Sequence, residues 1–140
     1  MVDRHSGRSL LHGRAVAAIA VAALVATGGC ASAATSDVQA AAQRFQTAIR
    51  DHQPEVACGM LSDEARSSLQ STSARPCDQA LDALHLSGAS PGAIEVWGDN
   101  AQVRLPGGAL FLAEFSAGWK ITGAGCTPRA DRPYACSVRS

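Results

Sequence analysis

The apolar residues downstream of residue 36 first recur with the period of an α-helix. Over residues 36–50 they occupy offsets 0, 3, 4, 7, 10 and 11, a spacing that places them on one helix face. Ser36 and Gln39 have the spacing of a capping box, which predicts that this helix begins at Ser36. The residues of the stripe are Val38, Ala41, Ala42, Phe45, Ala48 and Ile49.

Three shorter helices are predicted to follow. The first spans residues 54–61, because proline is favoured in a first helical turn. The second begins after Ser62, whose hydroxyl can cap it, and ends near Gln70. The third begins at Cys77, has apolar residues at offsets 0, 3, 4 and 7, and stops before Gly88.

After Pro91-Gly92 the apolar period changes from that of a helix to that of a strand. The connections between the predicted strands are short, so sequential strands are expected to pair antiparallel. Helices followed by such a meander predict a single α+β domain over residues 37–140, with the helices packed on one face of the sheet. The predicted strands cover residues 94–96, 101–105, 110–115, 119–122 and 134–138.

The first thirty residues have the three zones of an export signal. A basic stretch to Arg14 precedes the uncharged apolar run 15–27, and Gly28-Gly29-Cys30 follows. The apolar run matches the hydrophobic region of a secretory signal and is shorter than the roughly 20 residues that span a bilayer. Residues 1–29 are therefore predicted to be a signal peptide.

Two processing routes compete at the end of this signal. The segment Ala26-Thr27-Gly28-Gly29-Cys30 resembles a bacterial lipobox, which implies diacylglycerol on the Cys30 thiol and cleavage before it. The rival is Ala31-Ser32-Ala33, an A-x-A site whose cleavage would discard Cys30 and release a soluble, secreted protein. We favour lipidation, because a cysteine directly after paired glycines ends the apolar run. Residues 30–36 would then be the lipidated cysteine and a short flexible leash.

The distribution of charge along the chain limits the possible partners. Arg4, Arg8 and Arg14 all lie in the predicted signal, whereas from residue 31 onward there are nine basic and eleven acidic residues. Lys120 is the one lysine of the chain. A slightly acidic domain lacks the basic surface that binds nucleic acid, so we predict no nucleic-acid partner. The membrane contact is expected through the lipid on Cys30.

Setting Cys30 aside leaves four cysteines, and an even number in an exported chain predicts disulfides. Four cysteines allow three connectivities, which the sequence does not distinguish. Proximity along the chain favours Cys58–Cys77 and Cys126–Cys136.

Metal and thiol chemistry have weak support. The chain has no C-x-x-C or H-x-x-x-H pair, so no metal site is predicted. A catalytic thiol would require a nearby base, and His52 and His85 are the histidines downstream of the signal. Structural disulfides remain the preferred interpretation.

The layout then resembles a known group of proteins. The tail motifs Gly118-Trp119-Lys120, Ala124-Gly125-Cys126 and Pro133-Tyr134-Ala135-Cys136 resemble those of small uncharacterised lipoproteins of actinobacteria. Over residues 36–138 the order of elements is similar to the NTF2-like (cystatin-like) cone. This resemblance implies a curved sheet around the helices, with room for an apolar ligand. The superfamily includes isomerases, dehydratases and binding modules, so the fold does not choose among functions.

Two acid–histidine pairs are candidates for acid–base chemistry. Asp82 and His85 share a face of a predicted helix, but Asp82 lies off the apolar stripe, which favours a solvated pair. Asp51 and His52 lie in a loop between helices, where turn or cap roles are favoured.

The aromatic residues have packing roles in this interpretation. Tyr134 is predicted to pack beside a disulfide with its hydroxyl bonded, and Trp119 to lie in the core. Trp97 is out of phase with its strand, so it is either a core residue or an exposed contact.

No acid, base and oxyanion donor can be assembled into a catalytic set, so we predict no catalytic residues and no cofactor. The expectation is a non-enzymatic, membrane-anchored extracytoplasmic domain that binds a protein, a cell-wall component or a small apolar ligand. The alternative is an NTF2-like enzyme of the isomerase or dehydratase type. A cavity inside the sheet with two or more titratable groups would favour the enzyme.

Overall fold

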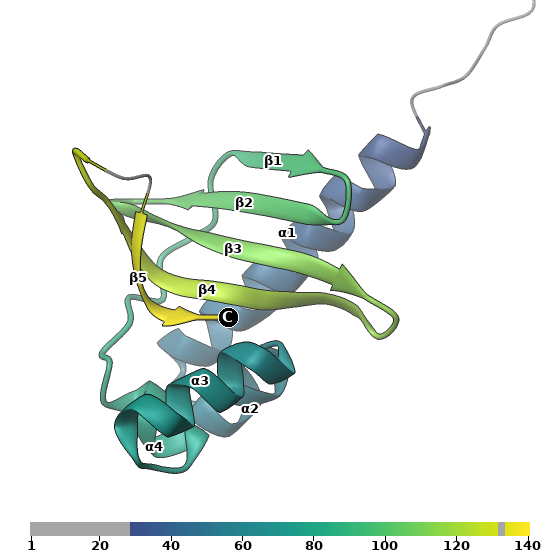
Figure 1. Cartoon of the computed structure of the whole chain (residues 1–140). Helices are drawn as coiled ribbons and strands as arrows, with labels where there is room; N and C mark the ends of the chain where they lie inside the picture. The colour runs from purple at the N-terminus through teal and green to yellow at the C-terminus, as the bar shows by residue number, and fades with distance from the viewer. Residues whose placement is uncertain (1–28, 132–133) are drawn as a thin grey trace, which may run out of the picture.

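The computed structural model describes residues 29–131 and 134–140, and within them it confirms the α+β class (Figure 1). The five strands form one open antiparallel sheet in the order β1-β2-β3-β4-β5, as the short connections predicted. The helices are α1 (Gly29–Arg50), α2 (Pro54–Met60), α3 (Asp63–Ser73) and α4 (Cys77–Asp82), and the strands are β1 (Ile94–Trp97), β2 (Asn100–Leu105), β3 (Gly108–Phe115), β4 (Gly118–Pro128) and β5 (Tyr134–Arg139).

Helix α1 begins at Gly29, seven residues before the predicted start at Ser36. The Ser36 hydroxyl donates to the carbonyl oxygen of Ala33 at 2.8 Å, so Ser36 lies inside the helix and does not cap it. Residues 30–36, expected to be a flexible leash, are helical. Alanine has the highest helix propensity, and three alanines in this stretch extend the helix backwards.

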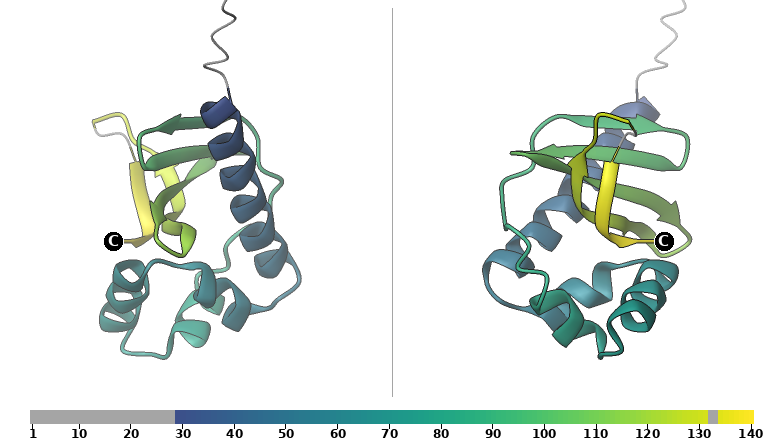
Figure 2. Two further views of the ribbon diagram at one scale, coloured as in Figure 1. Left: turned by 90° about the vertical axis from the view of Figure 1, so that its right-hand side faces the viewer. Right: turned by 60° about the vertical axis from the view of Figure 1, so that its left-hand side comes forward.

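Helix α1 crosses one face of the sheet, and its apolar stripe is buried there (Figures 1 and 2). Phe45 is 1% exposed and packs in a core to which β2, β3 and β4 contribute Val103, Leu110 and Ile121. Ile49, the last residue of the predicted stripe, is only partly buried. The core therefore lies between α1 and the sheet, and the same cluster continues into the buried residues of α2, α3 and α4.

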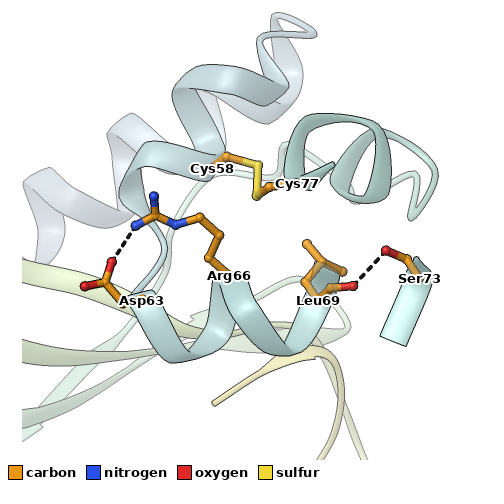
Figure 3. Close-up of a disulfide and its surroundings, with 6 residues drawn as sticks. All are labelled: Cys58, Asp63, Arg66, Leu69, Ser73 and Cys77. Atoms are coloured by element: carbon orange, nitrogen blue, oxygen red, sulfur yellow. Dashed lines mark hydrogen bonds and ion pairs between the residues drawn. A yellow bond between two sulfur atoms is a disulfide. The ribbon is translucent and has the colours of Figure 1, made fainter. Parts of the chain in front are cut away.

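Helices α2, α3 and α4, which we call the helical unit, pack together beyond one edge of the sheet (Figure 1). The disulfide Cys58–Cys77 joins α2 to α4 (Figure 3). Helix α3 runs to Ser73, past the predicted end near Gln70, and Ala74 closes it in the left-handed conformation. Helix α4 is shorter than predicted, and two hydrogen-bonded turns lead from it to His85.

Ser62 joins the helical unit to the sheet. Its hydroxyl accepts from the backbone N–H of Ala65 at 3.1 Å, which is the predicted cap of α3. Its own backbone N–H donates to the carbonyl oxygen of Ile121 in β4 at 2.9 Å, and its hydroxyl lies 3.2 Å from that of Ser140. One buried serine thus connects α3, β4 and the C-terminal residue.

Strand β4 is longer than predicted and irregular. Its pairing with β3 shifts register twice, once between Ala109 and Phe111 and once between Phe111 and Leu112. Gly125 lies in the first irregularity with φ of +62°, a conformation that glycine adopts without steric cost. Such bulges bend a strand and redirect its side chains, and this one forms part of a cavity wall described below.

Candidate functional site

Cys30, the predicted lipidation site, lies in the first turn of α1. Its lipidation stays a prediction, because its side chain and the predicted signal lie outside the described residues. Within residues 29–131 and 134–140, no helix combines the length and hydrophobicity that a bilayer-spanning segment requires.

The four remaining cysteines form Cys58–Cys77 and Cys126–Cys136, the two pairs that proximity along the chain favoured. The first joins two helices, and the second joins directly opposed residues of β4 and β5. Two disulfides indicate an oxidising, extracytoplasmic environment.

A cavity of about 120 Å³, which we call the sheet cavity, lies between α1 and the sheet. Phe45 and Gln46 of α1 form one wall, and the β2–β3 turn with the bulged part of β4 forms the other. Its apolar lining includes Leu86, Leu105 and Leu110. None of its lining residues carries a charge.

Gln46 is the unusual residue of this cavity, because its side chain is only 2% exposed. Its amide makes no side-chain hydrogen bond within the described part of the chain. No fully occluded side-chain nitrogen or oxygen there lacks a partner, so the unbonded Gln46 amide keeps some accessible surface, and Gln46 lines the sheet cavity. Full burial of an amide without a partner would cost about 1–3 kcal/mol, so an amide that keeps accessible surface beside a cavity is a candidate for ligand contact.

Gln46 was not among the candidate residues predicted from the sequence, although the pattern carried a signal. Gln46 stands at offset 8 from Val38, a position that belongs to the buried face of an amphipathic helix. A polar residue in the middle of an apolar stripe predicts a buried polar group. Only its side-chain partners distinguish a structural role from a binding one.

The two acid–histidine pairs meet in a second hollow at the junction of α1 and the helical unit. His52, Asp82 and His85 all line this cleft of about 240 Å³, which we call the histidine cleft. Both histidines have left-handed backbones, with φ of 53° for His52 and 47° for His85. The sequence treated these pairs as separate, and the fold brings three of their four residues to one hollow.

The histidine cleft is nevertheless a solvated surface feature. His52, Asp82 and His85 are exposed. The sequence predicted a solvated pair for Asp82 and His85, and a turn or cap role for His52. Among the described residues, no group of His, Cys, Asp or Glu side chains has an arrangement that could hold a metal ion. The cleft therefore gathers titratable groups without burying them.

The remaining aromatic candidates form packing contacts. The Tyr134 hydroxyl accepts a hydrogen bond from Gln102 at 3.0 Å, and its ring meets that of Phe111 edge-on at 5.2 Å. Trp119 is buried in the core. Trp97 is 50% exposed, so the alternative of an exposed aromatic is the correct one.

Comparisons with known proteins give no functional assignment. No family model matches the chain, and no curated protein matches it. Among solved structures, a protein of unknown function from Mycobacterium tuberculosis matches with 17% identity over 74% of each chain and a TM-score of 0.32. That organism is an actinobacterium, the group suggested by the sequence resemblance, but a likeness this weak supports no conclusion.

Proposed function

We propose that this chain is an exported lipoprotein whose acylated Cys30 holds a small, oxidised binding domain at the outer face of a membrane. The observation that carries the binding role is the sheet cavity, in which the unbonded Gln46 amide stands among apolar walls. The curved sheet over α1 is, in this proposal, an NTF2-like cone with open edges. The domain binds a ligand and catalyses no reaction.

The position of Cys30 supports the anchoring half of the proposal. The first turn of α1 and the helical unit lie at opposite ends of the molecule (Figure 2). Ala34, four residues after Cys30, is partly buried against the core. At 1.5 Å per residue, the helix between these two residues rises about 6 Å. An anchor at Cys30 would therefore leave the histidine cleft facing away from the membrane.

The chemistry of the two hollows supports binding over catalysis. An enzyme of the isomerase or dehydratase type requires an acid or base inside a pocket where it meets the substrate. The titratable groups line the exposed histidine cleft, whereas the sheet cavity is lined by neutral residues. A neutral hydrogen-bonding cavity is suited to holding a molecule without transferring a proton.

Intact mass spectrometry of membrane and secreted fractions tests the proposal, with the wild type beside Cys30→Ala. The wild-type chain is expected in the membrane fraction, beginning at Cys30 and carrying acyl groups, since two or three chains anchor stably. Reduction should add two hydrogens for each of two disulfides. Ser36→Ala is the matched control, because it lies in the same helix and keeps the cleavage site.

Each alternative has its own signature in this experiment. Cleavage after Ala33 would give a secreted chain that begins at residue 34 without lipid. A Cys30→Ala variant that stays bound to the membrane would contradict the anchor. Full-length protein with free thiols in cytosolic extract would overturn export altogether.

A further inference from the structure

We propose that the sheet cavity binds a small neutral molecule that ends in a group with both a hydrogen-bond donor and an acceptor, such as a primary amide, on a short apolar body. This inference rests on the proposed binding role and names the class of ligand. It stands on the Gln46 side chain, the walls around it and the size of the space.

The Gln46 carboxamide defines the polar end of the ligand. It is 2% exposed and has no side-chain hydrogen bond within residues 29–131 and 134–140, yet it borders the cavity. A carboxamide presents an acceptor oxygen and two donor hydrogens side by side. The group that satisfies both is one that itself accepts and donates, as an amide does.

The uncharged lining of the cavity excludes a charged ligand. Phe45, Leu86, Leu105 and Leu110 line the cavity, and none of its lining residues is charged. A charged group placed here would lose its hydration without gaining an opposite charge. The exposed hydroxyl residues Ser87 and Thr127 also contribute to the lining and mark its solvent side. The ligand is therefore neutral, with its apolar part against the leucines.

The volume sets the length of the ligand. The sheet cavity measures about 120 Å³. A dry cavity of about 150 Å³ accommodates benzene, so about five or six non-hydrogen atoms fit here. Butyramide has that size, an amide end and an apolar tail. Butylammonium has a similar size but carries a charge, so it serves as the matched negative probe.

Titration of the disulfide-intact protein with each probe, followed by NMR of the side-chain amide signals, tests the assignment. Butyramide is expected to shift the Gln46 side-chain signals saturably with a Kd of order 1 mM, and butylammonium is not. Gln46→Leu should weaken butyramide binding at least tenfold. Gln39→Leu is the control, because Gln39 is an exposed glutamine of the same helix.

Measuring the stability of the Gln46 variants distinguishes loss of a binding group from loss of the fold. Gln46→Leu should unfold at a higher denaturant concentration than the wild type, because it replaces an amide that has no protein partner with an apolar side chain among apolar walls. If this variant does not fold, Gln46→Met repeats the test with an unbranched side chain. Both variants are expected to lose butyramide binding while keeping their disulfides.

Three results would overturn the inference. The first is the absence of a saturable shift with butyramide, which would mean that water alone satisfies the amide. The second is equal binding of butyramide and butylammonium. The third is unchanged butyramide binding by the Gln46 variants. None of them bears on the Cys30 anchor, whose failure would appear as membrane retention of Cys30→Ala. The two proposals therefore fail separately.

Discussion

Helix α1 is long and packs across a sheet held by backbone ladders, whereas the helical unit, which shares the same core, is built from short helices. Helix α1 has 22 residues, and α2, α3 and α4 have 7, 11 and 6. Isolated helices below about 12–15 residues are marginal in water. The sheet layer relies on packing and backbone ladders, whereas the helical unit combines its packing with a covalent bridge and the junction at Ser62.

The two disulfides show this difference. Cys58–Cys77 joins helices that share no backbone ladder, with 19 residues of sequence separation. Cys126–Cys136 spans 10 residues and links strands that the ladder between β4 and β5 already holds in register. Each restricts the unfolded chain by a similar amount, about 3 kcal/mol. What differs is how much native structure depends on the bridge.

The largest effect is expected in the core of the sheet layer. Phe45→Ala should lower the free energy of unfolding by about 3–5 kcal/mol, because Phe45 is 1% exposed. Urea denaturation followed by circular dichroism measures the loss. Phe115→Ala is the control, since Phe115 is 46% exposed and should change stability little. Equal losses in the two variants would contradict the placement of the core.

The disulfides should give the next largest effect, and hydrogen exchange distinguishes them. Replacing Cys58 and Cys77 with alanine should cost about 3 kcal/mol and remove amide protection from α2 and α4 first. Replacing Cys126 and Cys136 should cost up to about 3 kcal/mol but leave β4 protected until global unfolding. Early loss of protection in β4 would show that the sheet layer depends on its bridge as well.

The smallest effect tests the junction of the two regions. Ser62→Ala removes the cap of α3 and should lower the free energy of unfolding by about 1 kcal/mol. Thermal unfolding measures it, with Ser67→Ala as the control because Ser67 is an exposed residue of the same helix. Because Ser62 also contacts Ser140, protection should fall in both α3 and the C-terminal end of β5. A change confined to α3 would mean that Ser62 acts only as a cap.

Local patterns predicted the presence of helices and strands better than the residues at which they begin and end. The stripe from Val38 and the cap at Ser62 identified α1 and α3, since helix periodicity and capping are short-range. The early start of α1 and the length of β4 were missed. The helical residues before Ser36 have no apolar stripe from which their helix could be predicted. Strand β4 contains bulges that break the alternation on which strand prediction depends.

The site was harder to predict than the fold. Asp82, His85 and His52 were recognised as exposed polar residues, but their common cleft depends on how α1 meets the helical unit. Gln46 stands on the predicted buried face of α1, yet the space beside its amide comes from the β2–β3 turn and from β4. Those segments lie about 60 to 80 residues further along the chain.

The sequence by itself determined the α+β class, the meander and the chemistry of each side chain, and it favoured the two cysteine pairs closest along the chain without excluding the other connectivities. Periodicity, turn residues and loop closure act over a few residues, so they can be read from the order of amino acids. The tertiary structure decided which polar groups share a hollow and placed Gln46 beside the sheet cavity. Both depend on contacts between distant segments, which local patterns do not encode.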